Sequence, residues 1–136
     1  MGRAPDLVVV ELGANDMLRG LPPAQAQASL DAILAELSRR HLPVLLTGMR
    51  ASPNLGSDYR RQFDAIYPAL ARKYHTAFYP FFYDGIVGRS SLIQADGLHP
   101  NASGVRIIVA RMVPAVIAAL GQTSRYARPN SGAARK

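Results

Sequence analysis

Asp96 and His99 form the residue pair in this chain best suited to acid–base chemistry. They lie three positions apart in the sequence Asp96-Gly97-Leu98-His99-Pro100. At this spacing the carboxylate can hold one imidazole nitrogen, which leaves the other free to act as general base toward a serine hydroxyl. The simpler alternatives are an Asx turn closed by Asp96 and a local turn or capping role for His99. This spacing is common by chance, but together with the continuation Pro100-Asn101 and the upstream sequence Gly13-Ala14-Asn15-Asp16 it predicts the base and the orienting acid of a hydrolytic site.

A second polar cluster follows an apolar run near the start of the chain. Asn15 comes just after the run Leu7–Leu12, and α/β sheets bind ligands beyond the carboxyl ends of their strands. The Asn15 side chain can donate an N–H group to a developing oxyanion, and a left-handed turn residue is the alternative. Gly13 and Asp16 are assigned to substrate binding. We expect Asp16 to hold the loop by accepting backbone N–H groups rather than to perform chemistry.

These two clusters belong to a larger set of sequence blocks that resembles one family. The blocks are Val8–Asp16 followed by Leu18-Arg19-Gly20, then Asn54–Tyr59, Tyr79–Phe82 and Asp96–Asn101. In this order they resemble the SGNH (GDSL-type) hydrolases, and within them the arylesterase, thioesterase I and lysophospholipase L1 group. The resemblance implies a carboxylic-ester or thioester hydrolase that needs no cofactor and acts on small-molecule ester, thioester or lysophospholipid substrates.

The resemblance also assigns roles to the residues of the predicted site. A Ser-His-Asp acyl-enzyme mechanism would use His99 as the base and Asp96 as its partner, with Asn15 in the oxyanion hole. Family members carry the nucleophilic Ser, in a Gly-Asp-Ser sequence, and a Gly block before the stretch that opens this chain. No Gly-Asp-Ser occurs here, and Gly56-Ser57-Asp58 has a different order in a different loop. We therefore expect a fragment that is inactive alone. The alternative is a catalytically dead α/β binding or interaction module.

Apolar runs and helical periodicities alternate along the chain. This alternation predicts an α/β fold with right-handed βαβ units and helices on both faces of a parallel sheet. The resemblance adds a three-layer, flavodoxin-like α/β/α arrangement with strand order 2-1-3-4-5, truncated here to its last three strands. The expected strands are Leu7–Leu12, Pro43–Thr47 and Thr76–Tyr79, and the expected helices are Pro23–His41, Ser57–Tyr74 and Asn101–Leu120.

Two features of these elements lead to further expectations. Loss of the first two strands would leave Leu7–Leu12 as an exposed apolar edge, which is an association hazard. We therefore expect the chain to be marginally stable, or to pair through this edge with itself or with another polypeptide. The last helix is expected to end with Gly121 as its C′ residue and to turn one apolar side toward the sheet: Val105, Ile108, Val109, Met112, Val116 and Ile117.

The charge of the chain is concentrated at its carboxyl end. The net charge is +7, and residues 121–136 hold four basic residues and no acid. We expect a hydrolase-type domain over residues 1–120 and a basic, disordered tail over 121–136, with contact to an anionic surface or nucleic acid as the alternative for the tail. No nucleic-acid motif occurs in the domain. No apolar run without charges approaches the ~18 residues of a membrane span, so none is expected.

The remaining candidates for chemistry receive structural interpretations. His41 and His75 are expected near helix C-termini, and Asn101 is expected to cap the last helix. The serines lack a nucleophile-elbow context. The three His and nine carboxylates show no metal-ligand spacing, so no metal is predicted. No signal peptide is visible, although SGNH hydrolases are often periplasmic or secreted. The compartment therefore stays open.

Overall fold

The sheet at the centre of the molecule has three parallel strands. The computed structural model describes residues 2–126 and shows β1 (Val8–Val10), β2 (Val44–Thr47) and β3 (Ala77–Tyr79) in the order β1-β2-β3. β1 pairs with β2 and β2 with β3, both in parallel. β2 is the central strand, and all four of its residues are buried. The predicted α/β class and parallel sheet are confirmed.

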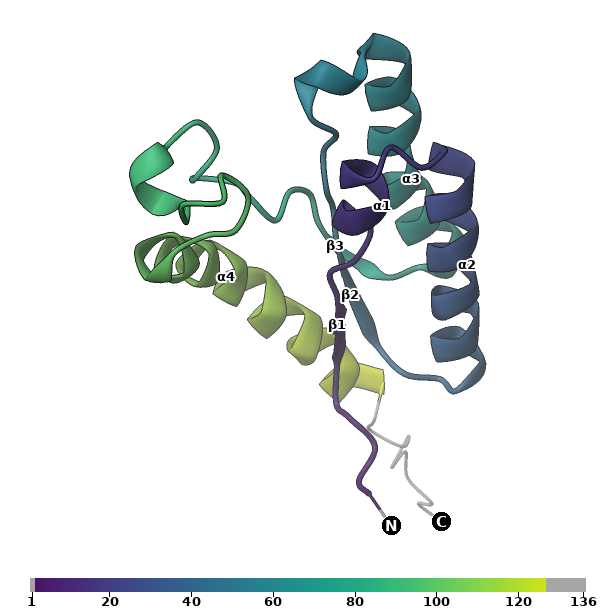
Figure 1. Cartoon of the computed structure of the whole chain (residues 1–136). Coiled ribbons are helices and arrows are strands. Elements are labelled where there is room, and N and C mark those ends of the chain that lie inside the picture. Colours follow the sequence, from purple (N-terminus) through teal and green to yellow (C-terminus); the bar gives the residue numbers. More distant parts are fainter. Residues whose placement is uncertain (1, 127–136) are drawn as a thin grey trace, which may run out of the picture.

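Helices lie on both faces of this sheet (Figure 1). The two central helices cover one face, and the last helix crosses the other face at an angle to the strands. The result is the expected three-layer arrangement. The elements beside the strands are α1 (Ala14–Leu18), α2 (Pro23–Arg39), the 3₁₀ turn η1 (Pro53–Leu55), α3 (Ser57–Tyr74), the 3₁₀ turn η2 (Ser90–Leu92) and α4 (Ala102–Tyr126).

The layer formed by α2 and α3 closes its face of the sheet completely. Leu30 and Leu34 of α2 meet Phe63 and Tyr67 of α3, and all four side chains are buried. Apolar residues recur at three- and four-residue intervals on both helices, so one stripe of each faces the strands. Burial of a side chain the size of Phe63 contributes roughly 1.5–3 kcal/mol. This layer holds the larger of the two hydrophobic clusters.

β1 is shorter than predicted and lies at the edge of the sheet. Its three residues form the strand, whereas Glu11 and Leu12 already leave it toward α1. Val10 points into the α2/α3 core, but Val9 points to the other face and is 44% exposed. The apolar run Leu7–Leu12 was expected to form a buried strand, but its strand residues are buried only on the α2/α3 face. Association through this edge stays a prediction.

α4 differs from its prediction in both length and orientation. Ile108 is buried as expected, but Val109 is 51% and Ile117 63% exposed. Val105 is exposed as well, whereas Met112 and Val116 are half-buried, so the expected face is covered only in part. At the start of the helix the buried residue is Gly104, where a Cβ would collide with the Leu92 carbonyl. The helix also continues through Gly121 to Tyr126, so the first part of the tail expected to be disordered is helical. Residues 127–136 lie outside the described residues.

The exposed apolar residues give α4 the composition of a membrane span. Within the described residues, the stretch Ala102–Thr123 is long and apolar enough to cross a membrane, with a hydropathy of 1.8 and only 17% of the window buried. The stretch contains Arg106 and Arg111, so the expectation, which concerned runs without charges, is not contradicted, and the absence of a span stays a prediction. Length and composition alone are weak evidence for a span, and α4 contacts β2 and β3, while its Ile108 packs with Ile86 and Leu92 in a second, smaller cluster.

Candidate functional site

Asp96 and His99 contact each other as the sequence predicts. The Asp96 Oδ2 atom lies 2.6 Å from His99 Nδ1, and the Oδ1 atom accepts hydrogen bonds from the backbone N–H groups of Leu98 and His99. One carboxylate thus closes the turn and holds the imidazole, so the two interpretations of Asp96 apply together. With Nδ1–H donated to Asp96, the lone pair of His99 lies on Nε2. The His99 side chain is 65% exposed.

The loop that carries this pair is held by local hydrogen bonds. Asn101 caps α4, because its Oδ1 accepts hydrogen bonds from the Ser103 and Gly104 N–H groups at 3.0 Å each. Its Nδ2 donates to the Ser91 carbonyl at 2.8 Å. The His99 carbonyl accepts a hydrogen bond from Gln94 N at 2.7 Å. The predicted cap at Asn101 is confirmed, and it fixes the backbone just after His99.

The electrostatics of the pair favour an ionised Asp96. The hydrogen bond from His99, followed by those from the Leu98 and His99 backbone, lowers the pKa of Asp96 to about 2. A carboxylate that accepts several hydrogen bonds is stabilised in its charged form. Asp96 is therefore an anion at neutral pH and can stabilise an imidazolium on His99.

Asn15 lies on a short helix rather than on a loop. α1 begins directly after Gly13, whose φ of 109° favours glycine, and Asn15 is exposed in its first turn. A Cβ on Gly13 would collide with the Tyr67 hydroxyl, which donates to the Leu12 carbonyl at 2.9 Å. The sequence reasoning missed α1 because five residues give no helical periodicity. The backbone turn at Gly13 and the Tyr67 hydrogen bond to Leu12 together position the start of α1, and with it Asn15.

Tyr83 lies between the two clusters. Its hydroxyl donates to the Leu98 carbonyl at 3.1 Å. Burial raises the pKa of Tyr83, and the carboxylates of Glu11 and Asp96 raise it further, so both acids lie near it. Burial also raises the pKa of Glu11, which is half-buried just after β1. Sequence reasoning assigned no role to Glu11 or Tyr83, since Glu11 reads as part of a strand and Tyr83 as core.

The geometry agrees with comparisons to known proteins. Residues 2–107 match the GDSL-like lipase/acylhydrolase family. The chain belongs to this family. Esterase TesA of Pseudomonas aeruginosa is 44% identical over 96 residues, which are 71% of this chain and 48% of TesA. Thioesterase 1/protease 1/lysophospholipase L1 of Escherichia coli strain K12 is 39% identical over 97 residues, covering 71% of this chain and 47% of that protein.

A solved structure extends the likeness to three dimensions. AlinE4, described as an esterase of the SGNH-hydrolase family, is 52% identical with a TM-score of 0.69, and the match covers 88% of this chain and 64% of AlinE4. The resemblance inferred from the sequence blocks is thereby confirmed. This GDSL-like chain spans about half the length of the curated relatives it matches.

The partners of the His99 ring bear on the expected absence of a nucleophile. Within residues 2–126, the His99 ring hydrogen-bonds only to Asp96, and no serine hydroxyl contacts it. Asp16 is half-buried near Tyr67, but over the same residues its carboxylate accepts none of the backbone hydrogen bonds that we expected. The assignments of Gly13 and Asp16 to substrate binding stay predictions.

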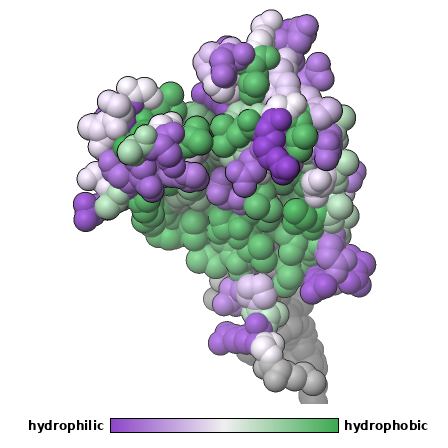
Figure 2. Space-filling model, viewed as in Figure 1, coloured by the Kyte–Doolittle hydropathy of each residue, from purple (hydrophilic) through white to green (hydrophobic). Residues whose placement is uncertain are grey.

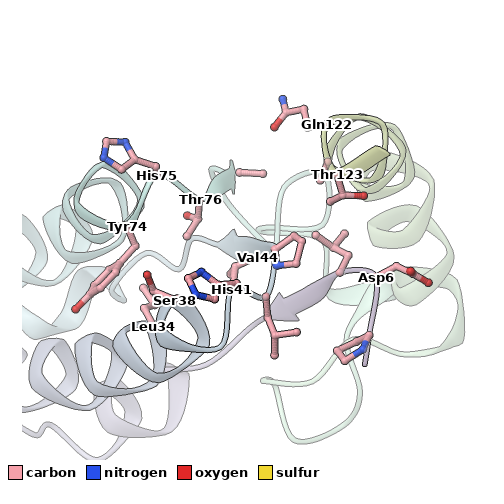
Figure 3. Close-up of a pocket in the computed structure, with 16 residues that line it drawn as sticks. Asp6, Leu34, Ser38, His41, Val44, Tyr74, His75, Thr76, Gln122 and Thr123 are labelled. Atoms are coloured by element: carbon pink, nitrogen blue, oxygen red, sulfur yellow. The ribbon is translucent and has the colours of Figure 1, made fainter. Parts of the chain in front are cut away.

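Figure 3 shows a cavity whose lining includes none of the predicted site residues. It has a volume of about 770 Å³ and is bordered by Leu7, Val44 and Ala77, where the three strands begin. Asn15 instead lies on α1, shortly after the carboxyl end of β1, and His99 lies on the loop between η2 and α4. His41 and His75 also line the cavity, and both have left-handed backbone just beyond α2 and α3. The position expected for these two histidines is confirmed.

The titratable residues of the described part do not form a metal site. Between residues 2 and 126, no three His, Cys, Asp or Glu side chains gather closely enough to hold a metal ion. The contact between Asp96 and His99 is suited to proton transfer by His99, with Asp96 as its anionic partner. Asn15 is an exposed amide donor on α1, and within residues 2–126 no hydrogen bond joins it to Asp96 or His99.

Proposed function

We propose that this chain forms the acid–base part of a carboxylic-ester or thioester hydrolase of the SGNH type. The observation that carries the proposal is the 2.6 Å contact between Asp96 and His99, with Nε2 free on an exposed ring. Membership of the GDSL-like family supports it further. The names esterase, thioesterase and lysophospholipase among the relatives agree with an acyl substrate.

The proposed mechanism uses a serine that lies outside these 136 residues. His99 Nε2 accepts the serine proton as the oxygen attacks the acyl carbonyl, and Asp96 stabilises the resulting imidazolium. The Asn15 amide donates a hydrogen bond to the tetrahedral oxyanion. The imidazolium then protonates the leaving alcohol or thiol. Water activated by His99 releases the acid from the acyl-enzyme and regenerates the serine.

The role of Tyr83 in this proposal is to position the base. Its hydrogen bond to the Leu98 carbonyl fixes the turn directly before His99. Its partial burial against Phe82 ties that turn to the body of the protein. A base held at both ends of its loop keeps Nε2 in one place, which proton transfer requires.

The test compares the chain alone with an extended version. The extended protein carries the N-terminal segment of AlinE4, up to the start of the match, fused before Met1. We expect the extended protein to label with a fluorophosphonate and to hydrolyse p-nitrophenyl esters, and the 136-residue chain to do neither. In the extended protein, His99→Ala should abolish labelling, and Asn15→Ala should lower kcat by ~10²–10³. Strong labelling of the chain alone would contradict the proposal.

A catalytically dead binding or interaction module is the second candidate. It is favoured by the absence of a serine hydroxyl on the His99 ring within residues 2–126. An extended protein that folds, binds a short-chain acid or ester and still shows neither labelling nor turnover would support this candidate instead.

A further inference from the structure

Three aromatic residues line one side of α3. Tyr59, Phe63 and Tyr67 recur at intervals of four, so their side chains share one face of the helix. The Tyr59 and Phe63 rings stack with their centroids 6.0 Å apart, and the Phe63 and Tyr67 rings meet edge to face at 5.7 Å. Phe63 and Tyr67 are buried, and Tyr59 is half-buried. We call these three residues the aromatic row. Its buried middle ring holds the two tyrosines in place.

The two tyrosine hydroxyls of the aromatic row donate to the backbone on either side of α1. The Tyr67 hydroxyl donates to the Leu12 carbonyl at 2.9 Å, just before α1 begins. The Tyr59 hydroxyl donates to the Leu21 carbonyl at 2.7 Å, shortly after α1 ends. Residues 12–21, which include Asn15, are therefore held at both ends by a single helix.

α1 depends on such anchors because it is short. It has five residues, and isolated helices shorter than about 12–15 residues are marginal in water. Met17 is its buried residue. Figure 2, in the view of Figure 1, shows hydrophilic and hydrophobic residues side by side over α1, whereas the surface over β1 is hydrophobic. Burial of Met17 and the two tyrosine hydrogen bonds therefore hold α1 in place.

Backbone hydrogen bonds connect the Tyr59 contact to Asn15. The Leu21 N–H donates to the Asp16 carbonyl at 3.0 Å, and the Arg19 N–H donates to the Asn15 carbonyl at 3.0 Å. The Leu21 carbonyl is thus bound to Tyr59, and the Leu21 N–H is bound to the residue next to Asn15. A shift of Leu21 therefore moves the end of α1 and Asn15 with it.

Both tyrosine hydroxyls are protonated donors at neutral pH. Burial raises the pKa of Tyr59, and the Asp16 carboxylate raises it further. Burial also raises the pKa of Tyr67, and the carboxylates of Glu11 and Asp16 add to this effect. Asp16 therefore lies near both tyrosines and favours the neutral form that donates a hydrogen bond.

We propose that Tyr59 is a positioning residue that sets the place of the Asn15 amide through the carboxyl end of α1. This inference rests on the proposed function, in which Asn15 donates to the tetrahedral oxyanion. Such a donor is effective only within hydrogen-bond distance of the oxyanion, so a small displacement of α1 lowers the rate. The Tyr59 hydroxyl is bonded to Leu21, so it acts through the backbone and not on the substrate.

The first experiment uses the 136-residue chain and needs no activity. Tyr59→Phe removes one hydroxyl and keeps the ring of the aromatic row. We expect the amides of Arg19 and Leu21 to exchange about three- to tenfold faster, because their acceptors lie in α1. Tyr74→Phe is the matched control. It removes another α3 hydroxyl, which bonds Asp31 at 3.0 Å, and it should leave the amides of Arg19 and Leu21 unchanged.

The second experiment uses the extended protein described under the proposed function. Tyr59→Phe should lower kcat about three- to tenfold and change KM less than twofold, because the Asn15 hydrogen bond forms in the transition state. In an Asn15→Ala background, the same substitution should cause no further loss of kcat, since Tyr59 acts through Asn15. Tyr74→Phe should leave kcat unchanged. A purely structural role of Tyr59 would not depend on the Asn15 amide.

The outcomes separate this inference from the proposed function. Amides of Arg19 and Leu21 that exchange as in the parent chain overturn the inference, because α1 is then held without Tyr59. Losses of kcat that multiply in the double variant overturn it as well, because Tyr59 then acts independently of Asn15. An extended protein without any activity contradicts the proposed function, and the amide exchange still decides whether Tyr59 holds α1.

Discussion

The two faces of the sheet differ in how fully this chain covers them. On the α2/α3 face, Phe63 and Tyr67 are fully enclosed between two helices and the strands. On the α4 face, a single helix buries Ile108 and Ala119 and leaves Val109 exposed. The same sheet therefore has one face completed by residues of this chain and one face that is half covered. The difference shows that the α2/α3 side of the fold buries its apolar residues without help from any other polypeptide.

The two halves of the candidate site belong to these different faces. Asn15 is positioned through Gly13 and the hydrogen bond from Tyr67, a residue of the closed layer. His99 sits on the loop before α4, which is held by its own hydrogen bonds and by Tyr83. The two halves are therefore held by different parts of the fold. Four substitutions test this contrast between the faces.

Phe63→Ala should cause the largest loss. It removes a fully buried ring from the closed layer, and such truncations cost about 3–5 kcal/mol of unfolding free energy. Urea unfolding followed by circular dichroism measures the change. A loss below about 1 kcal/mol would mean that the α2/α3 layer is as loosely packed as the α4 face.

Gly13→Ala should have the next largest effect. The new Cβ would collide with the Tyr67 hydroxyl, and the φ of 109° is strained for alanine. Such strain costs about 1–3 kcal/mol. Gly20→Ala is the matched control, because Gly20 has a φ of 66° but open space around it. Equal losses in the two variants would show that Tyr67 can move aside freely.

His99→Ala should shift the titration of Asp96. The folded-state pKa of Asp96, about 2, lies below its ordinary value of 3.8, so the pair stabilises the fold above pH 3.8 and loses that effect as pH falls toward 2. Without His99 the pKa should rise toward 3.8, as carboxyl NMR shifts would show. Glu36, whose pKa is also about 2 because of Arg39 and Arg40, is the control and should not move.

Val109→Ala should have the smallest effect. The side chain is 51% exposed in the chain alone, and alanine has the higher helix propensity. We expect the unfolding free energy to stay within about 0.5 kcal/mol of the parent. Thermal unfolding by calorimetry measures it. A loss comparable to that of Phe63→Ala would mean that this part of α4 is already covered in solution.

Much of this arrangement follows from local sequence patterns. Leu30, Leu34, Phe63 and Tyr67 fall on helical stripes, and they are the residues that close the α2/α3 layer. The contact between Asp96 and His99 depends on a spacing of three within one turn, so no distant part of the chain is needed to predict it.

The predictions for α4 and for Glu11 failed because they depend on contacts between distant segments, which local sequence patterns do not show. The periodicity of α4 shows which residues are apolar but not what covers them, so Val109 and Ile117 were expected against the sheet. Gly121 reads as a helix end, yet the helix continues because glycine in a helix costs only about 1 kcal/mol. Glu11 reads as strand, and its proximity to Tyr83 arises only when distant segments meet.

The two oxygens of the Asp96 carboxylate have different partners. Because Oδ1 is committed to the turn and only Oδ2 reaches the ring, folding of this short loop by itself selects the imidazole tautomer. The free nitrogen of His99, Nε2, is thus selected by contacts within the loop and not by a bound ligand.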